Sequence, residues 1–233
     1  MTQVRIESLL EGAQRAVGTV AIIDVFRAFT TAAVAFANGA ARIIMVSGVE
    51  EALALRAQGI GQVCMGEVGG RAPAGFDFGN SPWQVSQADL RGKTLIQRTS
   101  AGTQGVVASA RADRRYAASL VTARATARAM LAGGPERITL VAMGKEAVDR
   151  TEEDEVCALH LRNLLEGRKG DPDAVRAMIL AGAEASRFGD PARPHLPAED
   201  REIALDVDRF DFAIRIGIED GRPTACVERP TPA

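Results

Sequence analysis

Short apolar runs alternate with longer segments of helical character through the first two thirds of the chain. Residues Gly18–Ile23 form an almost continuous apolar run, which is typical of a buried strand. The Ala-rich segment Arg27–Asn38 is typical of a helix, and Gly39 after Asn38 is a common helix stop. The same alternation predicts strands at 42–46, 62–65, 93–98, 115–118 and 137–142 and helices at 49–58, 102–112 and 121–131.

The pattern breaks once, between residues 66 and 82, and changes character after Glu152. Residues 66–82 contain five glycines and two prolines and show neither a helical nor a strand period. A long irregular segment inside a compact domain is usually functional or disordered. The final third predicts helices at 152–166 and 172–188, a polar stretch at 189–197, and strands at 212–218 and 224–228 joined by a turn at 219–222.

Strands separated by helices place the chain in the α/β class, with a mostly parallel or mixed sheet covered on both faces and a C-terminal hairpin. At 233 residues the chain has the length of one sizeable domain, and we expect a single domain over 1–233. The alternative division gives residues 190–233 a small C-terminal sub-lobe of their own.

Composition narrows the class of protein. Apolar residues make up 46% and charged residues 25%, and the formal net charge of −2 argues against nucleic acid as the main partner. Three widely spaced cysteines fit no disulfide framework and indicate a reducing cytoplasm. No apolar run approaches the roughly 18–20 residues that cross a bilayer, so a membrane partner is not expected. Only two histidines occur, which leaves few candidates for histidine chemistry.

Asp24 and Arg27 directly follow the apolar strand at 18–23. In open α/β sheets ligands bind outside the carboxyl ends of the strands, which places Asp24 to hold a metal ion and Arg27 to bind an anion. The alternative is a helix N-cap by Asp24 and a solvated Arg27. The residues alone do not decide between the two.

The irregular segment gathers polar groups suited to the same chemistry. Glu67 follows a predicted strand, as Asp24 does, and Arg71 comes shortly after it. Asp77, Asn80 and Ser81 supply oxygen and amide groups suited to magnesium or to an anion. Gly, Asn, Ser and Pro are also ordinary turn residues, but the length of the loop and its concentration of acidic, amide and hydroxyl groups favour a functional role.

Two further clusters lie before predicted helices. The first cluster consists of Arg98, Thr99, Ser100, Gly102 and Thr103. Its backbone amides and hydroxyls could bind an anion at the start of the helix. The alternative is that Thr99 or Ser100 simply caps the helix. The second, Thr151 followed by the acids 152–155, resembles a capping box whose acids complement the helix dipole.

Taken in order, these segments resemble the 2-phosphosulfolactate phosphatase family. The resemblance covers roughly Val20 to Leu165, and its most specific string is Gly-Phe-Asp-Phe-Gly-Asn-Ser-Pro at 75–82. The other matching segments are 24–31, Gly66-Glu67, 99–103 and 153–155. One departure is Ala101, where the family commonly has asparagine in a Thr-Thr-Asn-Gly-Thr string.

The resemblance implies a three-layer α/β/α fold and a magnesium-dependent hydrolysis of 2-phospho-3-sulfolactate to sulfolactate and phosphate, a step in coenzyme M biosynthesis. It implies catalytic roles for Asp24, Arg27, Glu67 and Asp77, and Mg²⁺ ligands drawn from Asp24, Glu67, Asp77 and Asp154. Arg71, Asn80, Ser81 and the 98–103 cluster would then bind the substrate. Two alternatives stay open: a phosphatase of another small phosphorylated organic acid, and a non-catalytic anion-binding regulator. A homodimer is also compatible with an enzyme of this size.

Overall fold

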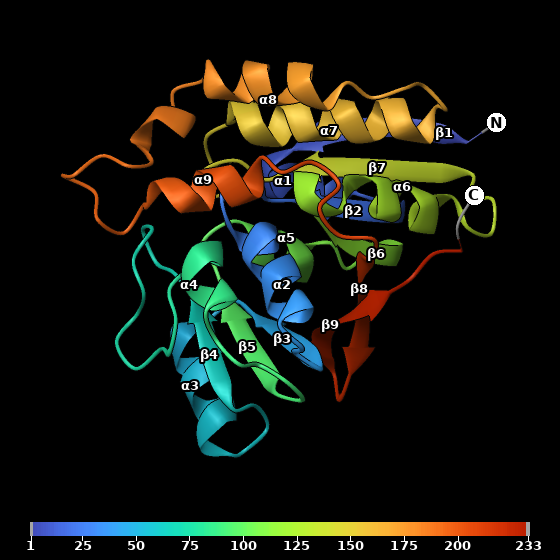
Figure 1. Ribbon diagram of the computed structural model, residues 1–233. Helices are drawn as coiled ribbons and strands as arrows, with labels where there is room; N and C mark the ends of the chain where they lie inside the picture. The colour runs from blue at the N-terminus through green and yellow to red at the C-terminus, as the bar shows by residue number, and fades with distance from the viewer. Residues whose placement is uncertain (1, 232–233) are drawn as a thin grey trace.

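The computed structural model describes residues 2–231 and places nine strands of that range in one mixed sheet with helices on both faces (Figure 1). The strands are β1 (Gln3–Ser8), β2 (Gly18–Ile23), β3 (Arg42–Val46), β4 (Val63–Gly66), β5 (Thr94–Arg98), β6 (Ala112–Ala118), β7 (Arg137–Ala142), β8 (Ala213–Glu219) and β9 (Arg222–Glu228). The helices are α1 (Leu9–Arg15), α2 (Ala28–Ala37), α3 (Val49–Ala57), α4 (Pro82–Ser86), α5 (Gly102–Ala108), α6 (Ala123–Leu131), α7 (Glu152–Leu165), α8 (Pro172–Leu180) and α9 (Ala198–Ala204), with 3-10 turns at Leu120–Thr122 and Ala185–Arg187.

The sheet consists of two parallel blocks joined by the C-terminal hairpin. Its order is β1-β7-β2-β6-β8-β9-β3-β5-β4. Strands β1, β7, β2 and β6 are mutually parallel, as are β3, β5 and β4. The three pairings through the hairpin, β6–β8, β8–β9 and β9–β3, are antiparallel, so the two blocks run in opposite directions along the sheet.

Twist brings the ends of the two blocks together. Neighbouring strands rotate by roughly 20–25° on average, so a large angle accumulates across the hairpin. In Figure 1, β2 and β7 run nearly horizontally, whereas β3, β4 and β5 lie below them and run at a steep angle to them. As a result, the carboxyl end of β2 lies close to the loop between β5 and α5, where Gly102 N donates a hydrogen bond to Asp24.

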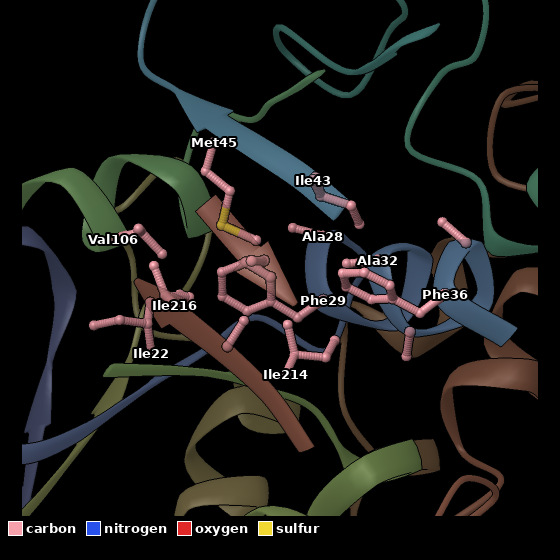
Figure 2. Close-up of a cluster of buried hydrophobic side chains, with 14 of the residues drawn as sticks. Ile22, Ala28, Phe29, Ala32, Phe36, Ile43, Met45, Val106, Ile214 and Ile216 are labelled. Carbon is pink, nitrogen blue, oxygen red and sulfur yellow. The ribbon is translucent and has the colours of Figure 1, made fainter. Parts of the chain in front are cut away.

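Alternate residues of β2 face two different cores. Val20 and Ile22 pack on the face covered by α1, α2 and α5, whereas Ala21 and Ile23 pack on the face covered by α6 and α7. Figure 2 shows the ring of Phe29, from α2, among Ile22, Met45 and Ile214. This one aromatic side chain therefore joins the two parallel blocks and the hairpin in a single buried cluster.

The α/β fold class, the layered architecture and the C-terminal hairpin are confirmed. Two helices are shorter than predicted: α5 ends at Ala108 because β6 already begins at Ala112, and α8 ends at Leu180, just before Gly182. The pattern did not reveal β1, α1, α4 or α9, which are short or lie at the N-terminus. Among residues 2–231, no helix has both the length and the apolar character needed to span a membrane.

Candidate active site

Asp24 joins the end of β2 to two helix N-termini. It is 5% exposed, and its Oδ1 accepts a hydrogen bond from Ala28 N in α2 at 2.9 Å. Its Oδ2 accepts one from Gly102 N in α5, also at 2.9 Å. A side chain at position 102 would meet the same carboxylate, since an added Cβ would lie 2.9 Å from Oδ2. The alternative interpretation of Asp24 as the N-cap with a solvated Arg27 is wrong, because Arg27 is the N-cap of α2 and is buried, although the Asp24 carboxylate does accept from the first amide of that helix.

Glu67 makes a comparable connection at the end of β4. Its Oε1 accepts a hydrogen bond from Ser100 N at 2.5 Å, and its Oε2 accepts from Gly70 N at 2.7 Å. Arg98 braces the same turn, because its Nη1 donates to Glu67 O at 2.6 Å and to Ser100 Oγ at 3.2 Å. Glu67 thus fixes the loop after β4 against the loop after β5.

These contacts change the expected role of the anion cradle. The amides of Ser100 and Gly102 donate to Glu67 and Asp24, and the amide of Thr103 donates to Thr99 Oγ1 at 3.1 Å. The protein's own carboxylates and hydroxyl therefore occupy the donors that the sequence offered to phosphate. The cluster holds the acids in place instead.

Two neighbouring acids at the start of α7 have different environments, because Asp154 is buried in hydrogen bonds and Glu153 lines a cavity. Asp154 is 2% exposed, and its two oxygens accept hydrogen bonds from Val25 N and Gly144 N, both at 2.8 Å. It therefore joins the chain segments that follow β2 and β7. Glu153, one position earlier, lines a cavity at these strand ends.

The cavity has a volume of about 330 Å³ and lies where the ends of β2, β4, β5 and β7 meet. Five carboxylates and three cationic side chains line it, which is a formal excess of two negative charges. The acids are Asp24, Glu67, Glu146, Glu153 and Glu184, and the cations are Arg27, Lys145 and Arg187. Phe26, Asn80, Ser100, Phe188, His195 and Leu196 also line it.

Burial opposes the ionisation of these acids. The pKa of Asp24 is raised from 3.8 to about 6, mainly by desolvation and also by the neighbouring Glu67, while the hydrogen bond from Ala28 N acts in the opposite direction. Desolvation likewise raises the pKa of Glu153 from 4.5 to about 7, with added repulsion from Glu184 and Asp24. The cavity therefore favours anything that neutralises its acids, whether protons or a cation.

Arg27 lines the cavity and also forms a buried ion pair with Asp200. Its Nη1 donates to Asp200 Oδ2 at 2.6 Å and to the carbonyl of His195 at 2.9 Å, while its Nη2 lies 3.5 Å from Gly70 O. The arginine side chain is 5% exposed and the carboxylate is fully buried. Ser81, predicted to bind substrate, donates to Asp200 Oδ1 at 2.7 Å and caps α4.

Three cavity-lining side chains have buried polar atoms without a protein partner. Asn80 Oδ1, Thr151 Oγ1 and His195 Nδ1 make no hydrogen bond to any residue in the 2–231 range. Buried polar groups in proteins are normally paired, so these three atoms are suited to a ligand. Burial and the positive charge of Arg71 and Arg27 lower the pKa of His195, which favours the neutral ring.

The structure does not bring every predicted residue to this cavity. Asp77 Oδ2 accepts hydrogen bonds from Arg56 Nη1 at 3.0 Å and Cys64 N at 2.8 Å, so its carboxylate secures the irregular loop to α3 and β4. Arg71, Arg98, Thr99, Thr103, Ser81, Gly102 and Asp154 do not line the cavity either, although several support residues that do. Within the described part of the chain, the four predicted metal ligands do not form a compact group, and no three His, Cys, Asp or Glu side chains cluster closely enough to be one.

Several cavity residues had no signal in the sequence. Five of them lie in loops or in the 3-10 turn at Ala185–Arg187, where the composition is ordinary for a surface; these are Lys145, Glu146, Glu184, Arg187 and His195. Asp200 lies in the first turn of α9, where an acid is expected from the helix dipole alone. Only the packing of the loop after β7 and of residues 184–200 around the cavity reveals their position.

The fold and the cavity together define an α/β protein whose strand ends enclose a small polar cavity, rich in carboxylates and bordered by cationic side chains. Such a cavity suits a compact anionic ligand accompanied by a cation. The chain belongs to the 2-phosphosulpholactate phosphatase family, whose model matches residues 5–189. The resemblance inferred from the motifs is thereby confirmed.

Individual relatives carry the same description. A probable 2-phosphosulfolactate phosphatase of Bacillus subtilis (strain 168) is 29% identical over 206 residues, which cover 87% of this chain and 89% of that protein. One from Thermoplasma volcanium is 32% identical over 190 residues, covering 82% and 85%. A shorter match, to one from Thermotoga petrophila, is 41% identical over 103 residues and covers 44% of each chain.

Proposed function

We propose that this protein is a phosphoric monoester hydrolase that cleaves 2-phospho-3-sulfolactate into sulfolactate and phosphate. Family membership and the names of the relatives support the reaction. The observation that carries the proposal is the meeting of Asp24, Glu67 and Glu153 with Arg27 in one cavity, formed by strand ends from both halves of the sheet. In such a cavity the carboxylates can bind a cation and the arginine can bind an anion.

Mg²⁺ fits the charge of this cavity. A phosphorylated acid brings several negative charges into a lining that already has two in excess, so binding without a cation would be opposed by repulsion. Carboxylate oxygens are the ligands that Mg²⁺ prefers, and the raised pKa values of Asp24 and Glu153 reflect first the cost of burying their charges and then repulsion from neighbouring acids, both of which a cation would offset. Among the described residues Asp24, Glu67 and Glu153 do not form a compact ligand group by themselves, so one or two of these carboxylates would contact the ion, together with water and substrate oxygens. When bound, Mg²⁺ supplies charge neutralisation at the phosphoryl oxygens.

Arg27 would bind the phosphoryl group. Its Nη1 is engaged by Asp200 and His195 O and its Nη2 has only a long contact of 3.5 Å to Gly70 O, while the side chain also lines the cavity. A planar guanidinium fixed in this way stabilises the charge of a phosphoryl group as its bond to the leaving oxygen breaks. Asn80 and His195, which have partnerless atoms, line the same cavity and would orient the substrate.

Lys145 and Arg187 would meet the remaining anionic groups of the substrate. Both pair with Glu184, Lys145 Nζ at 3.8 Å from Oε1 and Arg187 through its Nη1. This arrangement keeps two cations at the cavity wall while limiting their mutual repulsion. A carboxylate and a sulfonate are suitable partners for such side chains.

The decisive experiment measures phosphate release from racemic phosphosulfolactate, with Mg²⁺ and with a chelator. The wild type should release phosphate only with the metal, and Asp24→Asn should lower kcat/KM by about 100-fold or more, as expected for loss of a charged group at a reaction centre. Asp208→Asn is the matched control, because Asp208 pairs with Arg124 away from the cavity.

The outcomes separate the substrate from the reaction class. A wild type inactive on phosphosulfolactate but active on another phosphorylated acid from a panel would reject the substrate and retain the hydrolase. Absence of phosphate release from every substrate, with ligand binding preserved, would reject the enzyme and favour an anion-binding regulator.

A further inference from the structure

Asp200 is a fully buried carboxylate next to the cavity that would not itself contact the substrate of the proposed reaction. It contributes nothing to the cavity wall itself. It belongs to α9, which lies beyond residue 189, where the match to the family model ends. Its partner Arg27 lies 173 residues earlier in the chain.

The two oxygens of Asp200 have separate tasks. Oδ2 accepts the hydrogen bond from Arg27 Nη1 at 2.6 Å. Oδ1 accepts from Ser81 Oγ at 2.7 Å and from Trp83 N at 3.0 Å. Because the second oxygen is anchored to the start of α4, the first one has a fixed position that does not depend on Arg27.

Arg27 has further contacts in the segment that contains Asp200. The carbonyl of His195 accepts from the same Nη1 at 2.9 Å, and the guanidinium carbon lies 5.9 Å from the centre of the Phe188 ring. These groups all come from the segment 188–200. The segment therefore surrounds one edge of the guanidinium, while Nη2 lies 3.5 Å from Gly70 O and the side chain also lines the cavity.

We propose that Asp200 is a positioning residue that orients Arg27 toward the phosphoryl group of the substrate. The proposal rests on the proposed function, since it assigns Asp200 a role through the arginine of that reaction. An arginine held by a fixed carboxylate needs no rearrangement when substrate binds, and such preorganisation favours the reaction. Arg27 and Asp200 should accordingly act as one unit.

A double-mutant cycle tests this coupling, with kcat and KM measured for wild type, Asp200→Asn, Arg27→Ala and the double variant. The Asp200→Asn substitution keeps the size of the side chain but removes its charge and can place an amide N–H group opposite a donor. We expect it to lower kcat/KM by about 10- to 100-fold, mainly through kcat. In the Arg27→Ala background the same change should alter kcat/KM by less than about twofold.

Asp208→Asn is the matched control, because Asp208 also bonds an arginine side chain and a backbone amide, those of Arg124, at 3.1 and 2.7 Å. It should leave kcat/KM within about twofold of the wild type. If Asp200→Asn does not fold, Ser81→Ala replaces it in the cycle, since Ser81 holds Asp200 without contacting Arg27. Its effect should likewise vanish when Arg27 is absent.

Calorimetric binding of inorganic phosphate provides a second measurement that needs no turnover. If the wild type is inactive but Asp200→Asn weakens phosphate binding only when Arg27 is present, the proposed reaction fails and the positioning role survives. Equal losses in both backgrounds, in turnover or in phosphate binding, would overturn the positioning role. A wild type that neither turns over nor binds phosphate would overturn both.

Discussion

Replacing Glu153 by glutamine should stabilise the protein at alkaline pH while it damages the cavity. Glu153 is 4% exposed, and burial raises its pKa from 4.5 to about 7. Glutamine is close in shape to the protonated acid, so the variant removes the cost of ionising a carboxyl group in a buried position. We therefore expect a trade between stability and function at this residue.

The magnitude follows from the difference between the two pKa values. The pKa of Glu153 is about 2.5 units higher in the folded chain than in the unfolded chain. This difference corresponds to about 3 kcal/mol, since each pKa unit is worth about 1.4 kcal/mol. The pKa is raised in the fold, so the unfolded chain loses its proton first as pH rises. The wild type should lose this stability progressively from about pH 4.5 to about pH 7, with the full difference from the variant reached above that range.

Denaturant unfolding in chelator-containing buffer at pH 4 and pH 8 measures the effect. At about pH 4 the two proteins should be similar, and at about pH 8 Glu153→Gln should be more stable by about 3 kcal/mol, or roughly 6–12 °C in Tm. Adding Mg²⁺ should raise the stability of the wild type more than that of the variant if Glu153 helps to hold the ion.

Glu152→Gln is the control, because this exposed acid lies in the same first turn of α7. It should lose a few tenths of a kcal/mol through the helix dipole, which is a change of opposite sign. Equal stability of Glu153→Gln and wild type at alkaline pH without metal would refute the idea that this carboxylate is held ionised at a cost.

Three further variants test other parts of the structure. Arg71→Ala should raise KM more than it lowers kcat, since the family resemblance implies substrate binding by Arg71 and its charge is near enough to lower the pKa of the cavity-lining His195; equal losses in kcat and kcat/KM would contradict it. Asp77→Asn should lower the free energy of unfolding by about 1 kcal/mol through its bonds to Arg56 and Cys64 N, and should reduce turnover less than Asp24→Asn does. His160→Gln should flatten the fall in stability below about pH 6.5, because burial lowers the pKa of His160 and the unfolded chain takes up a proton first as pH falls; unchanged pH profiles would refute this.

Local signals in the sequence account for most of the elements and for the places where chemistry is concentrated. The apolar run at β2 and the helix stop at Asn38-Gly39 are such signals, and the structure has both elements at nearly the predicted bounds. Asp24 and Glu67 directly follow strands, so their location at strand ends could be predicted from position alone. The irregular segment 66–82 was identified because it lacks any period, and it contributes Glu67 and Asn80 to the cavity.

Which side chains share the cavity depends on the packing of the whole chain. Adjacent residues on a helix point about 100° apart, so the docking of α7 places Glu153 on the cavity wall and Asp154 in a buried joint beside it. The hairpin that reverses the sheet between β6 and β3 decides which strand ends meet, and the loops around Arg187 and His195 contribute only after the chain has returned to them. Asp200 reaches Arg27 across 173 residues. Such contacts depend on long-range packing, and no local pattern of residues encodes them.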